Sequence, residues 1–191
     1  GRVFGIIGMG EIGRRLIKLL TGFEMQKILV YDPYVSEEDI VALGVEKVSL
    51  EELCRESDFI SMNARLTEET RHLISKRELN LMKPNVYIIN TARAGLIDEE
   101  ALIKALKEDR IAGAGIDVFE QEPLPAEHPF LHLDNVTLTT HLAGTTIDAF
   151  PKSAKILLDD ILRLLEGKPA KFTPVRELID HIDWPKTFGI K

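Results

Sequence analysis

The sequence is poor in cysteine, in long apolar runs and in excess positive charge. Its one cysteine, Cys54, cannot form a disulfide within the chain, which fits a reducing, cytoplasmic location. No apolar run approaches the roughly 18 residues that a membrane span requires. The net charge of -7 argues against general electrostatic binding to nucleic acid or anionic lipid. We therefore expect small molecules or proteins as partners, and neither nucleic acid nor a membrane.

Short apolar runs predict the strands of a buried sheet. They lie at 3–7, 28–31, 59–62, 86–90, 111–118 and 136–140. These runs lack the alternation of a half-exposed antiparallel sheet, and helix-period segments separate them. We therefore predict an α/β fold of the Rossmann type, a doubly wound parallel sheet with helices on both faces.

The segments between these runs predict the helices. They lie at 11–21, 49–56, 75–82, 98–108 and 146–166. Ser49 and Asp98 stand where N-cap residues belong. The proline-rich segment 120–130 predicts an extended loop. We expect residues 1–166 to form one domain and 167–191 to form a tail that docks outside it.

A glycine-rich turn predicts dinucleotide binding. Gly8, Gly10 and Gly13 form a G-x-G-x-x-G pattern between the first strand and the first helix, whose N-terminal N–H groups favour phosphate. Asp32 ends the second strand 19 residues after Gly13, where a carboxylate binds both ribose hydroxyls and repels a 2′-phosphate. The pattern favours NAD over NADP. The plainer alternatives are an ordinary glycine turn and an aspartate that only forms the turn before Pro33.

Polar residues follow the later strands, at the sheet edge where ligands sit. Arg93 follows the strand at 86–90, while Glu122 and His141 follow the next two strands in the chain. Singly, they could be a surface arginine, a solvated loop acid and a turn histidine. Together they suit hydride transfer on a 2-hydroxy or 2-keto acid: an imidazole moves the hydroxyl proton, a carboxylate orients the imidazole, and a guanidinium binds the substrate carboxylate. We predict these three as catalytic residues.

Over about residues 1–166 the sequence resembles the coenzyme-binding domain of the NAD-dependent D-isomer 2-hydroxyacid dehydrogenases. The motifs that carry the resemblance occur in one order: GIIGMGEIG, VYDPY, LTEETRHLI, INTARAGLIDEEAL, AGIDVFEQEP and THLAGTT. The stretches YDPY and VSLEEL are most similar to the D-3-phosphoglycerate dehydrogenase branch. The resemblance implies an enzyme that interconverts a D-2-hydroxy acid and a 2-keto acid with NAD as cofactor, and it implies a homodimer.

The resemblance also implies roles for single residues. Arg93 would bind the carboxylate and carbonyl of the substrate. Glu122 would pair with His141, whereas the nearby Glu120 would not, and Asp117 would contact the nicotinamide amide. The implied cofactor-binding residues are Gly8, Gly10, Glu11, Ile12, Gly13, Asp32, Ala64, Thr91, Ala92, Arg93, Asp117, His141, Ala143 and Gly144.

The sequence departs from the family pattern at the margin of the pocket. Ala94 and Thr140 stand where many members have glycine and proline, and residues 63–67, Asn-Ala-Arg-Leu-Thr, stand where many have His-x-Pro-Leu-Thr. None of these departures removes a reacting group. No His/Cys/Asp cluster has metal-ligand spacing, so we predict no metal site. The histidines without a matching role are His72, His128, His132 and His181.

In this family an N-terminal segment and a C-terminal return build the substrate domain. The chain begins with Gly1 and lacks the N-terminal segment, so we expect a piece of a longer protein in which 167–191 returns to that domain. Alone, it should bind NAD but turn over poorly. A second hypothesis is an NAD(H)-sensing binding protein of the corepressor type on the same fold. Formate dehydrogenase relatives, which carry glutamine at the position of Glu122, rank lower.

Overall fold

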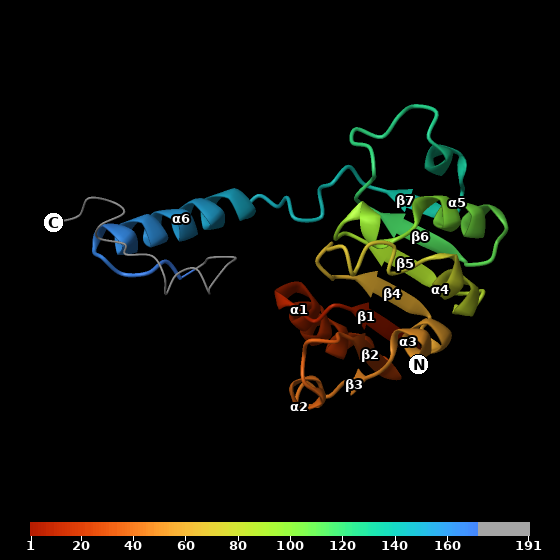
Figure 1. Ribbon diagram of the computed structural model, residues 1–191, viewed down its shortest axis with the longest axis horizontal. Helices are drawn as coiled ribbons and strands as arrows, with labels where there is room; N and C mark the ends of the chain where they lie inside the picture. Colours follow the sequence, from red (N-terminus) through yellow and green to blue (C-terminus); the bar gives the residue numbers. More distant parts are fainter. Residues whose placement is uncertain (172–191) are drawn as a thin grey trace. The chain divides into compact units, whose positions relative to one another are not determined.

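The computed structural model describes residues 1–171 (Figure 1). The chain divides into two compact units, Gly1–Leu142 and Ala143–Lys191. The first unit holds the sheet, and the described part of the second unit holds helix α6 (Ala149–Leu165). The predicted division at residue 166 stays a prediction, and 172–191, most of the predicted tail, lies outside the described residues.

The first unit is built on a 7-stranded sheet in the order β3-β2-β1-β4-β5-β6-β7, and all of its strand pairs are parallel (Figure 1). The strands are β1 (Val3–Ile7), β2 (Lys27–Tyr31), β3 (Glu46–Lys47), β4 (Phe59–Met62), β5 (Tyr87–Asn90), β6 (Gly113–Ile116) and β7 (Val136–Leu138). The winding reverses between β1 and β4, and ligands of such sheets bind beyond the carboxyl ends of the strands at this point. The predicted Rossmann-type fold is confirmed.

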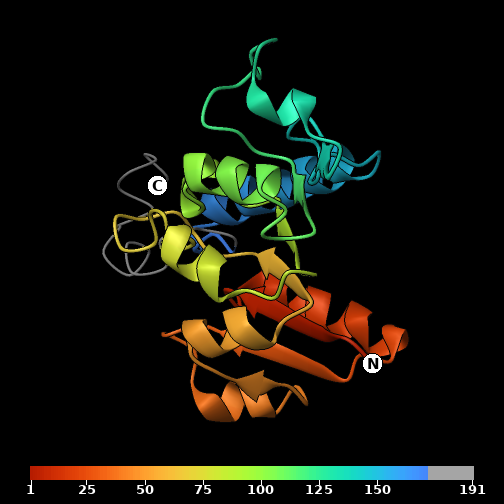
Figure 2. The ribbon, with the colours of Figure 1, turned by 90° about the vertical axis from the view of Figure 1, so that its right-hand side faces the viewer.

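Helices cover both faces of this sheet. They are α1 (Glu11–Leu20), α2 (Glu37–Val41), α3 (Leu50–Glu56), α4 (Lys76–Leu81) and α5 (Glu99–Lys107), with short 3-10 turns η1 (Thr21–Phe23), η2 (Ala94–Leu96) and η3 (Pro129–His132). Figure 2 shows α3, α4 and α5 on one face and α1 on the other. Leu53, Leu79 and Leu102 belong to the larger core on the first face, whereas Ile17 and Ile40 pack with Ile6 and Val30 in the smaller core.

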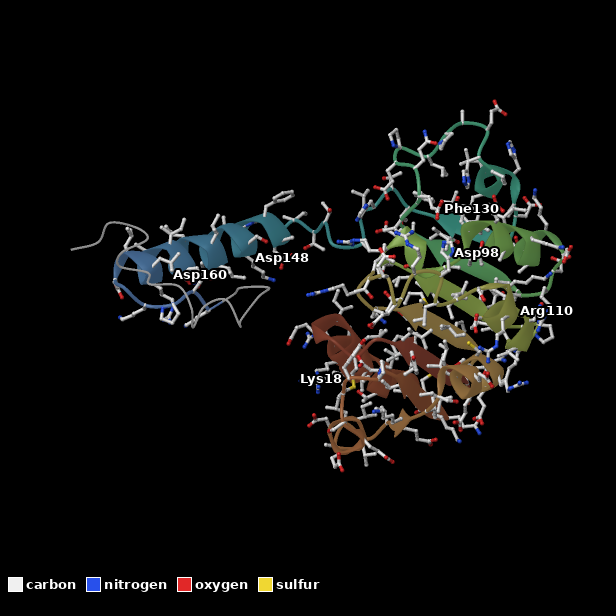
Figure 3. All side chains as sticks on the ribbon, viewed as in Figure 1. Lys18, Asp98, Arg110, Phe130, Asp148 and Asp160 are labelled. Carbon is white, nitrogen blue, oxygen red and sulfur yellow. The ribbon has the colours of Figure 1, made fainter. Side chains whose placement is uncertain are left out.

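The predicted helix starts rest on side-chain caps. The Ser49 hydroxyl accepts a hydrogen bond from the Glu52 N–H at 3.2 Å, and the Asp98 carboxylate accepts one from the Ala101 N–H at 3.0 Å. Figure 3 labels Asp98 at the start of α5. Each cap satisfies an N–H that the first helical turn leaves without a backbone partner.

Some short elements were missed by the sequence analysis. Helix α2 has 5 residues, too few to show a period, and it begins because the Ser36 hydroxyl accepts from the Asp39 N–H. Strand β3 has 2 residues and no apolar run. The segment 120–130, predicted to be an extended loop throughout, runs into η3 at Pro129, whose fixed φ suits the first position of a helix.

The second unit is described by α6, which has 17 residues. Many of its apolar side chains are exposed in this structure, among them Leu157, Leu158 and Leu162. The buried carboxylate of Asp160 accepts a hydrogen bond from the Lys171 N–H at 2.7 Å. Among the described residues, no helix combines the length and apolar character that crossing a membrane would need.

A buried carboxylate ties the amino-terminal ends of the central strands together. Asp58 precedes β4, and its Oδ2 accepts a hydrogen bond from the Val3 N–H of β1 at 2.9 Å. Its Oδ1 lies 3.2 Å from the Asn85 amide and 3.4 Å from the Lys83 ammonium. Burial alone would raise the pKa of Asp58, but the hydrogen bonds from Val3 and Asn85 and the charge of Lys83 hold it below its ordinary value.

We predict that Asp58→Asn lowers the free energy of unfolding by about 1–3 kcal/mol near neutral pH, because the Val3 N–H loses a charged acceptor. A carboxylate with a lowered pKa stabilises the fold above its unfolded-state pKa of about 3.9 and loses this effect as the pH falls through the folded-state value. Urea denaturation should therefore show a difference from the parent that shrinks in acid. The exposed Glu108→Gln is the control, and a pH-independent difference would contradict the charge argument.

Candidate active site

The glycine turn lies directly after β1, at the reversal of the sheet. Gly8 has φ +92, and a Cβ added there would lie 2.6 Å from the backbone nitrogen of Ala64. A Cβ on Gly13 would lie 2.4 Å from the Gly8 carbonyl oxygen, so α1 packs closely against this turn. Around Gly10, by contrast, nothing lies within 4 Å of the Cβ position. The outer glycines serve packing, and the middle one leaves room for a ligand beside the N-terminus of α1.

The Asp32 carboxylate is held in one position at the end of β2. Its Oδ2 accepts from the Met9 N–H at 2.8 Å, and its Oδ1 accepts from the N–H groups of Tyr34 at 2.9 Å and Val35 at 3.3 Å. Asp32 therefore does form the turn before α2. It also lines the cleft described next, so the turn role and the cofactor role are compatible.

Two adjoining clefts lie at the carboxyl ends of the strands. The first, about 750 Å³, is lined by Gly8, Gly10 and Asp32, and the second, about 450 Å³, is lined by Ile12, Thr91, Ala92 and Arg93. Both include Asn63, Ala64 and Arg65, so the clefts meet at the chain that follows β4. Each has the size typical of a small-ligand site. The structure thus brings eight of the predicted cofactor residues to one edge of the sheet: Gly8, Gly10, Ile12, Asp32, Ala64, Thr91, Ala92 and Arg93.

The turn that carries Arg93 is held by a residue that the sequence analysis missed. Asn90, the last residue of β5, is 2% exposed; its side chain donates to the Arg93 carbonyl at 3.0 Å and accepts from the Ala92 N–H at 3.1 Å. The sequence contains a signal for this role, because a polar residue at the end of a buried strand must find hydrogen-bond partners. The Arg93 guanidinium is exposed and donates to the Ala92 carbonyl at 2.6 Å. Within residues 1–171 it has no carboxylate partner, which suits an anionic ligand.

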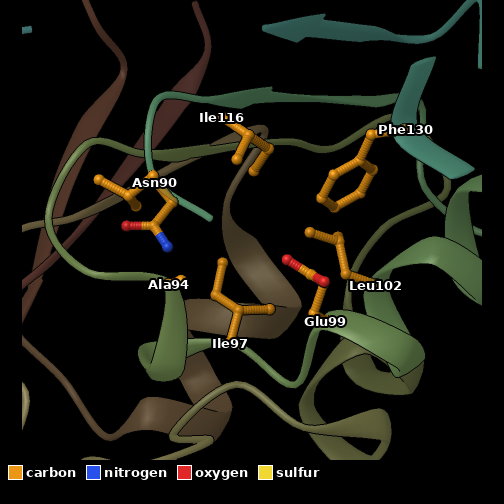
Figure 4. Close-up of a pocket in the computed structure, with 8 residues that line it drawn as sticks. Asn90, Ala94, Ile97, Glu99, Leu102, Ile116 and Phe130 are labelled. Atoms are coloured by element: carbon orange, nitrogen blue, oxygen red, sulfur yellow. The ribbon is translucent and has the colours of Figure 1, made fainter. Parts of the chain in front are cut away.

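A small cavity lies next to this turn (Figure 4). Asn90, Ala94, Ile97, Leu102 and Phe130 are among its lining residues, and its volume is about 10 Å³. This is the space of one water molecule at most, so the cavity is too small for a ligand.

Glu122 and His141 form a hydrogen-bonded pair. The His141 Nδ1 lies 2.9 Å and 3.2 Å from the two carboxylate oxygens, and one of these oxygens also accepts from the Phe119 N–H at 3.1 Å. The hydrogen bond from His141, aided by that from Phe119, holds the pKa of Glu122 below its ordinary value. An ionised carboxylate only accepts hydrogen bonds, so Nδ1 carries the proton and Nε2 is left for a reacting proton.

Asp117 holds the turn on which His141 sits. It is 2% exposed, directly after β6, and its Oδ1 accepts from the Thr139 hydroxyl at 2.5 Å and from the Leu142 N–H at 2.8 Å. Its carbonyl accepts from the His141 N–H at 2.8 Å, which steadies a residue with φ 57. The implied contact of Asp117 with nicotinamide stays a prediction.

Four other predicted cofactor residues of the first unit line neither cleft: Glu11, Gly13, Asp117 and His141. Gly13 packs against the Gly8 carbonyl, and Glu11 is exposed at the start of α1. Ala143 and Gly144 belong to the second unit, so their cofactor roles stay predictions.

Glu120 and His128, to which the family resemblance assigns no catalytic role, contact residues other than Glu122 and His141. Glu120 lies 3.9 Å from His72, not beside His141. His128 pairs with Glu99 at 3.1 Å in a largely buried contact, which indicates a structural role. Burial, aided by the nearby Glu78, raises the pKa of the Cys54 thiol to about 12, so Cys54 behaves as an apolar residue. No group of metal-binding side chains occurs among residues 1–171.

The parallel sheet, the glycine turn and the fixed acid after β2 define a dinucleotide-binding domain. The family model of the D-isomer specific 2-hydroxyacid dehydrogenase, NAD binding domain, matches residues 1–143. The chain belongs to this family, and its cofactor is NAD.

Known proteins of similar sequence and structure agree with this assignment. The chain is 44% identical over 172 residues to D-3-phosphoglycerate dehydrogenase of Methanocaldococcus jannaschii, covering 90% of the chain and 32% of the relative. It is 44% identical over 168 residues to glyoxylate reductase of Korarchaeum cryptofilum, covering 88% and 50%. The crystal structure of D-lactate dehydrogenase with NAD+ from Lactobacillus jensenii matches with a TM-score of 0.83 at 29% identity, covering 92% and 56%. The chain thus spans half or less of the length of these two curated relatives.

We predict that Gly10→Val abolishes NADH binding but leaves the fold intact. The side chain would enter the open space where the phosphates are expected, and nothing in the protein lies within 4 Å of its Cβ. Calorimetry would measure binding, and thermal melting would measure stability. Gly22→Val, at another glycine with open space around its Cβ, is the matched control and should bind normally. Normal binding by Gly10→Val would place the dinucleotide elsewhere.

Proposed function

We propose that the protein containing this chain is an NAD-dependent oxidoreductase that interconverts a D-2-hydroxy acid and a 2-keto acid. The observation that carries this proposal is the Glu122–His141 pair at 2.9 Å. It follows β6 and β7, at the sheet edge that also carries Arg93 and the glycine turn. The names of the relatives, D-3-phosphoglycerate dehydrogenase and glyoxylate reductase, support the substrate class.

Each side chain has a defined task in this reaction. When bound, NAD would supply the hydride acceptor for oxidation of the alcohol carbon, and NADH the hydride donor for reduction of the carbonyl carbon. His141 takes the hydroxyl proton on Nε2 during oxidation and gives it back to the carbonyl oxygen during reduction. Glu122 orients the ring through its hydrogen bond with Nδ1. Arg93 binds the substrate carboxylate through its planar guanidinium and polarises the carbonyl.

We also propose that residues 167–191 return to a substrate domain and that Ala143 and Gly144 complete the cofactor site. We further propose that the protein is a homodimer and that it is cytoplasmic. The exposed apolar side chains of α6 support an additional protein surface against this helix, and the free, buried Cys54 suits a reducing compartment. Light scattering that finds a monomer for the full-length protein would exclude the dimer.

We predict that His141→Asn in the full-length protein lowers kcat for 2-keto acid reduction by about 10²–10⁴-fold, the range expected for losing a general acid. Asparagine tolerates the positive φ at this position, and NADH affinity should change far less than kcat because the other predicted cofactor contacts remain. NADH oxidation, measured by absorbance over a panel of 2-keto acids, gives the rates. His132→Asn, an exposed histidine without an assigned role, is the control.

Retained turnover in His141→Asn would remove the proton-transfer role from this residue. If the parent protein binds NADH but reduces no member of the panel, an NAD(H)-sensing binding protein becomes the better account. The isolated 191-residue chain should bind NADH but reduce keto acids poorly, since it spans half or less of the length of the two curated relatives. Efficient reduction by this chain would contradict that expectation.

A further inference from the structure

Arg65 has no task in the reaction proposed above, although it lies at the junction of the two clefts. It is an exposed arginine in the segment after β4, and it lines both the cleft with Asp32 and the cleft with Arg93. A dinucleotide that places its adenosine ribose at Asp32 and its nicotinamide near Thr91 must pass through this junction. The part of NAD that lies between its two ribose rings is the diphosphate.

The backbone beside Arg65 is in contact with the glycine turn. The Asn63 N–H donates to the Ile7 carbonyl at 2.7 Å, and the Ala64 nitrogen lies 2.6 Å from the position of a Gly8 Cβ. Arg65 is the next residue along the chain. The backbone of Arg65 is therefore anchored beside the glycine turn, and Arg65 lines the same cleft as Gly10.

Hydrogen bonds within the loop also brace Arg65 from its other side. The Thr70 hydroxyl donates to the Arg65 carbonyl at 2.7 Å, and the Thr67 N–H donates to the same hydroxyl oxygen at 2.8 Å. A side chain on a braced backbone loses less conformational freedom on binding than one on a loose loop. The backbone that carries the Arg65 side chain is thus held in place.

Charge in the two clefts is arranged unevenly around Arg65. Acidic residues line the first cleft, namely Asp32, Glu68 and Glu69, whereas Arg65 and Arg93 are the charged residues that line the second. Among residues 1–171, no carboxylate forms an ion pair with the Arg65 guanidinium. A cation without a partner at the junction, with neutral or positive surroundings on one side, suits a diphosphate.

We infer that Arg65 binds the NAD diphosphate from the side opposite the N-terminus of α1. The α1 N–H groups and the guanidinium then hold the diphosphate between them. The inference rests on NAD binding to these clefts and deepens the proposed function by naming a residue that positions the cofactor. Arg93 remains the residue for the substrate carboxylate.

The test compares ligands that carry or lack the diphosphate. In the full-length protein, Arg65→Gln should weaken the binding of NADH and of ADP-ribose roughly tenfold or more, as expected for losing a charge-assisted hydrogen bond. Adenosine, measured by competition with NADH, should bind the variant and the parent alike. Arg65→Lys should recover part of the loss because it keeps the charge. Arg71→Gln, an exposed arginine of the same loop that lines neither cleft, is the matched control.

Other outcomes would overturn the inference. Unchanged NADH affinity with a raised KM for the keto acid would assign Arg65 to the substrate. A loss confined to NADPH would assign it to a 2′-phosphate, and an equal loss for adenosine and ADP-ribose would show a general disturbance of the cleft. These readouts measure binding, so they hold even if the protein proves to sense NADH and not to oxidise it.

Discussion

The contact between the turn at Gly8 and the chain at Ala64 positions the rest of the site. At 2.6 Å from the Ala64 nitrogen, a Cβ on Gly8 has no room, so two backbones from neighbouring strands meet where the sheet reverses its winding. This contact places the N-terminus of α1, the acid after β2 and the segment after β4 around one crevice. Any side chain at Gly8 would force the two strand ends apart and open the crevice.

Short polar side chains near the ends of the strands form hydrogen bonds that fix the turns carrying the functional groups. Asn90 holds the turn of Arg93, and Asp117 holds the turn of His141, each from a nearly buried position. The reacting groups themselves stay exposed, because substrate must reach them. At the turn of Arg93 the buried anchor and the exposed functional group are thus separate residues, so a change in Asn90 should alter the site without removing a predicted ligand-binding group.

Much of the fold could be predicted from the sequence, because buried parallel strands appear as continuous apolar runs and the glycine turn has a fixed spacing. Strand β3 and helix α2 could not be predicted, since each is too short to show a period. The pairing of Glu122 with His141 followed from family resemblance, and the structure contains it at 2.9 Å. The anchoring role of Asp117 was hidden because its partners, Thr139 and Leu142, are distant in sequence and meet it only after β6 and β7 pair.

The central claim is that one dinucleotide spans both clefts across the reversal of the sheet. Titrating NADH into the isotope-labelled chain and following backbone amide resonances by NMR tests this most directly. The account predicts the largest changes at Gly10, Ile12 and Ala92, with no change at Asn85 and Glu108, which lie away from the clefts. Changes confined to one cleft, or found only at the distant residues, would contradict it.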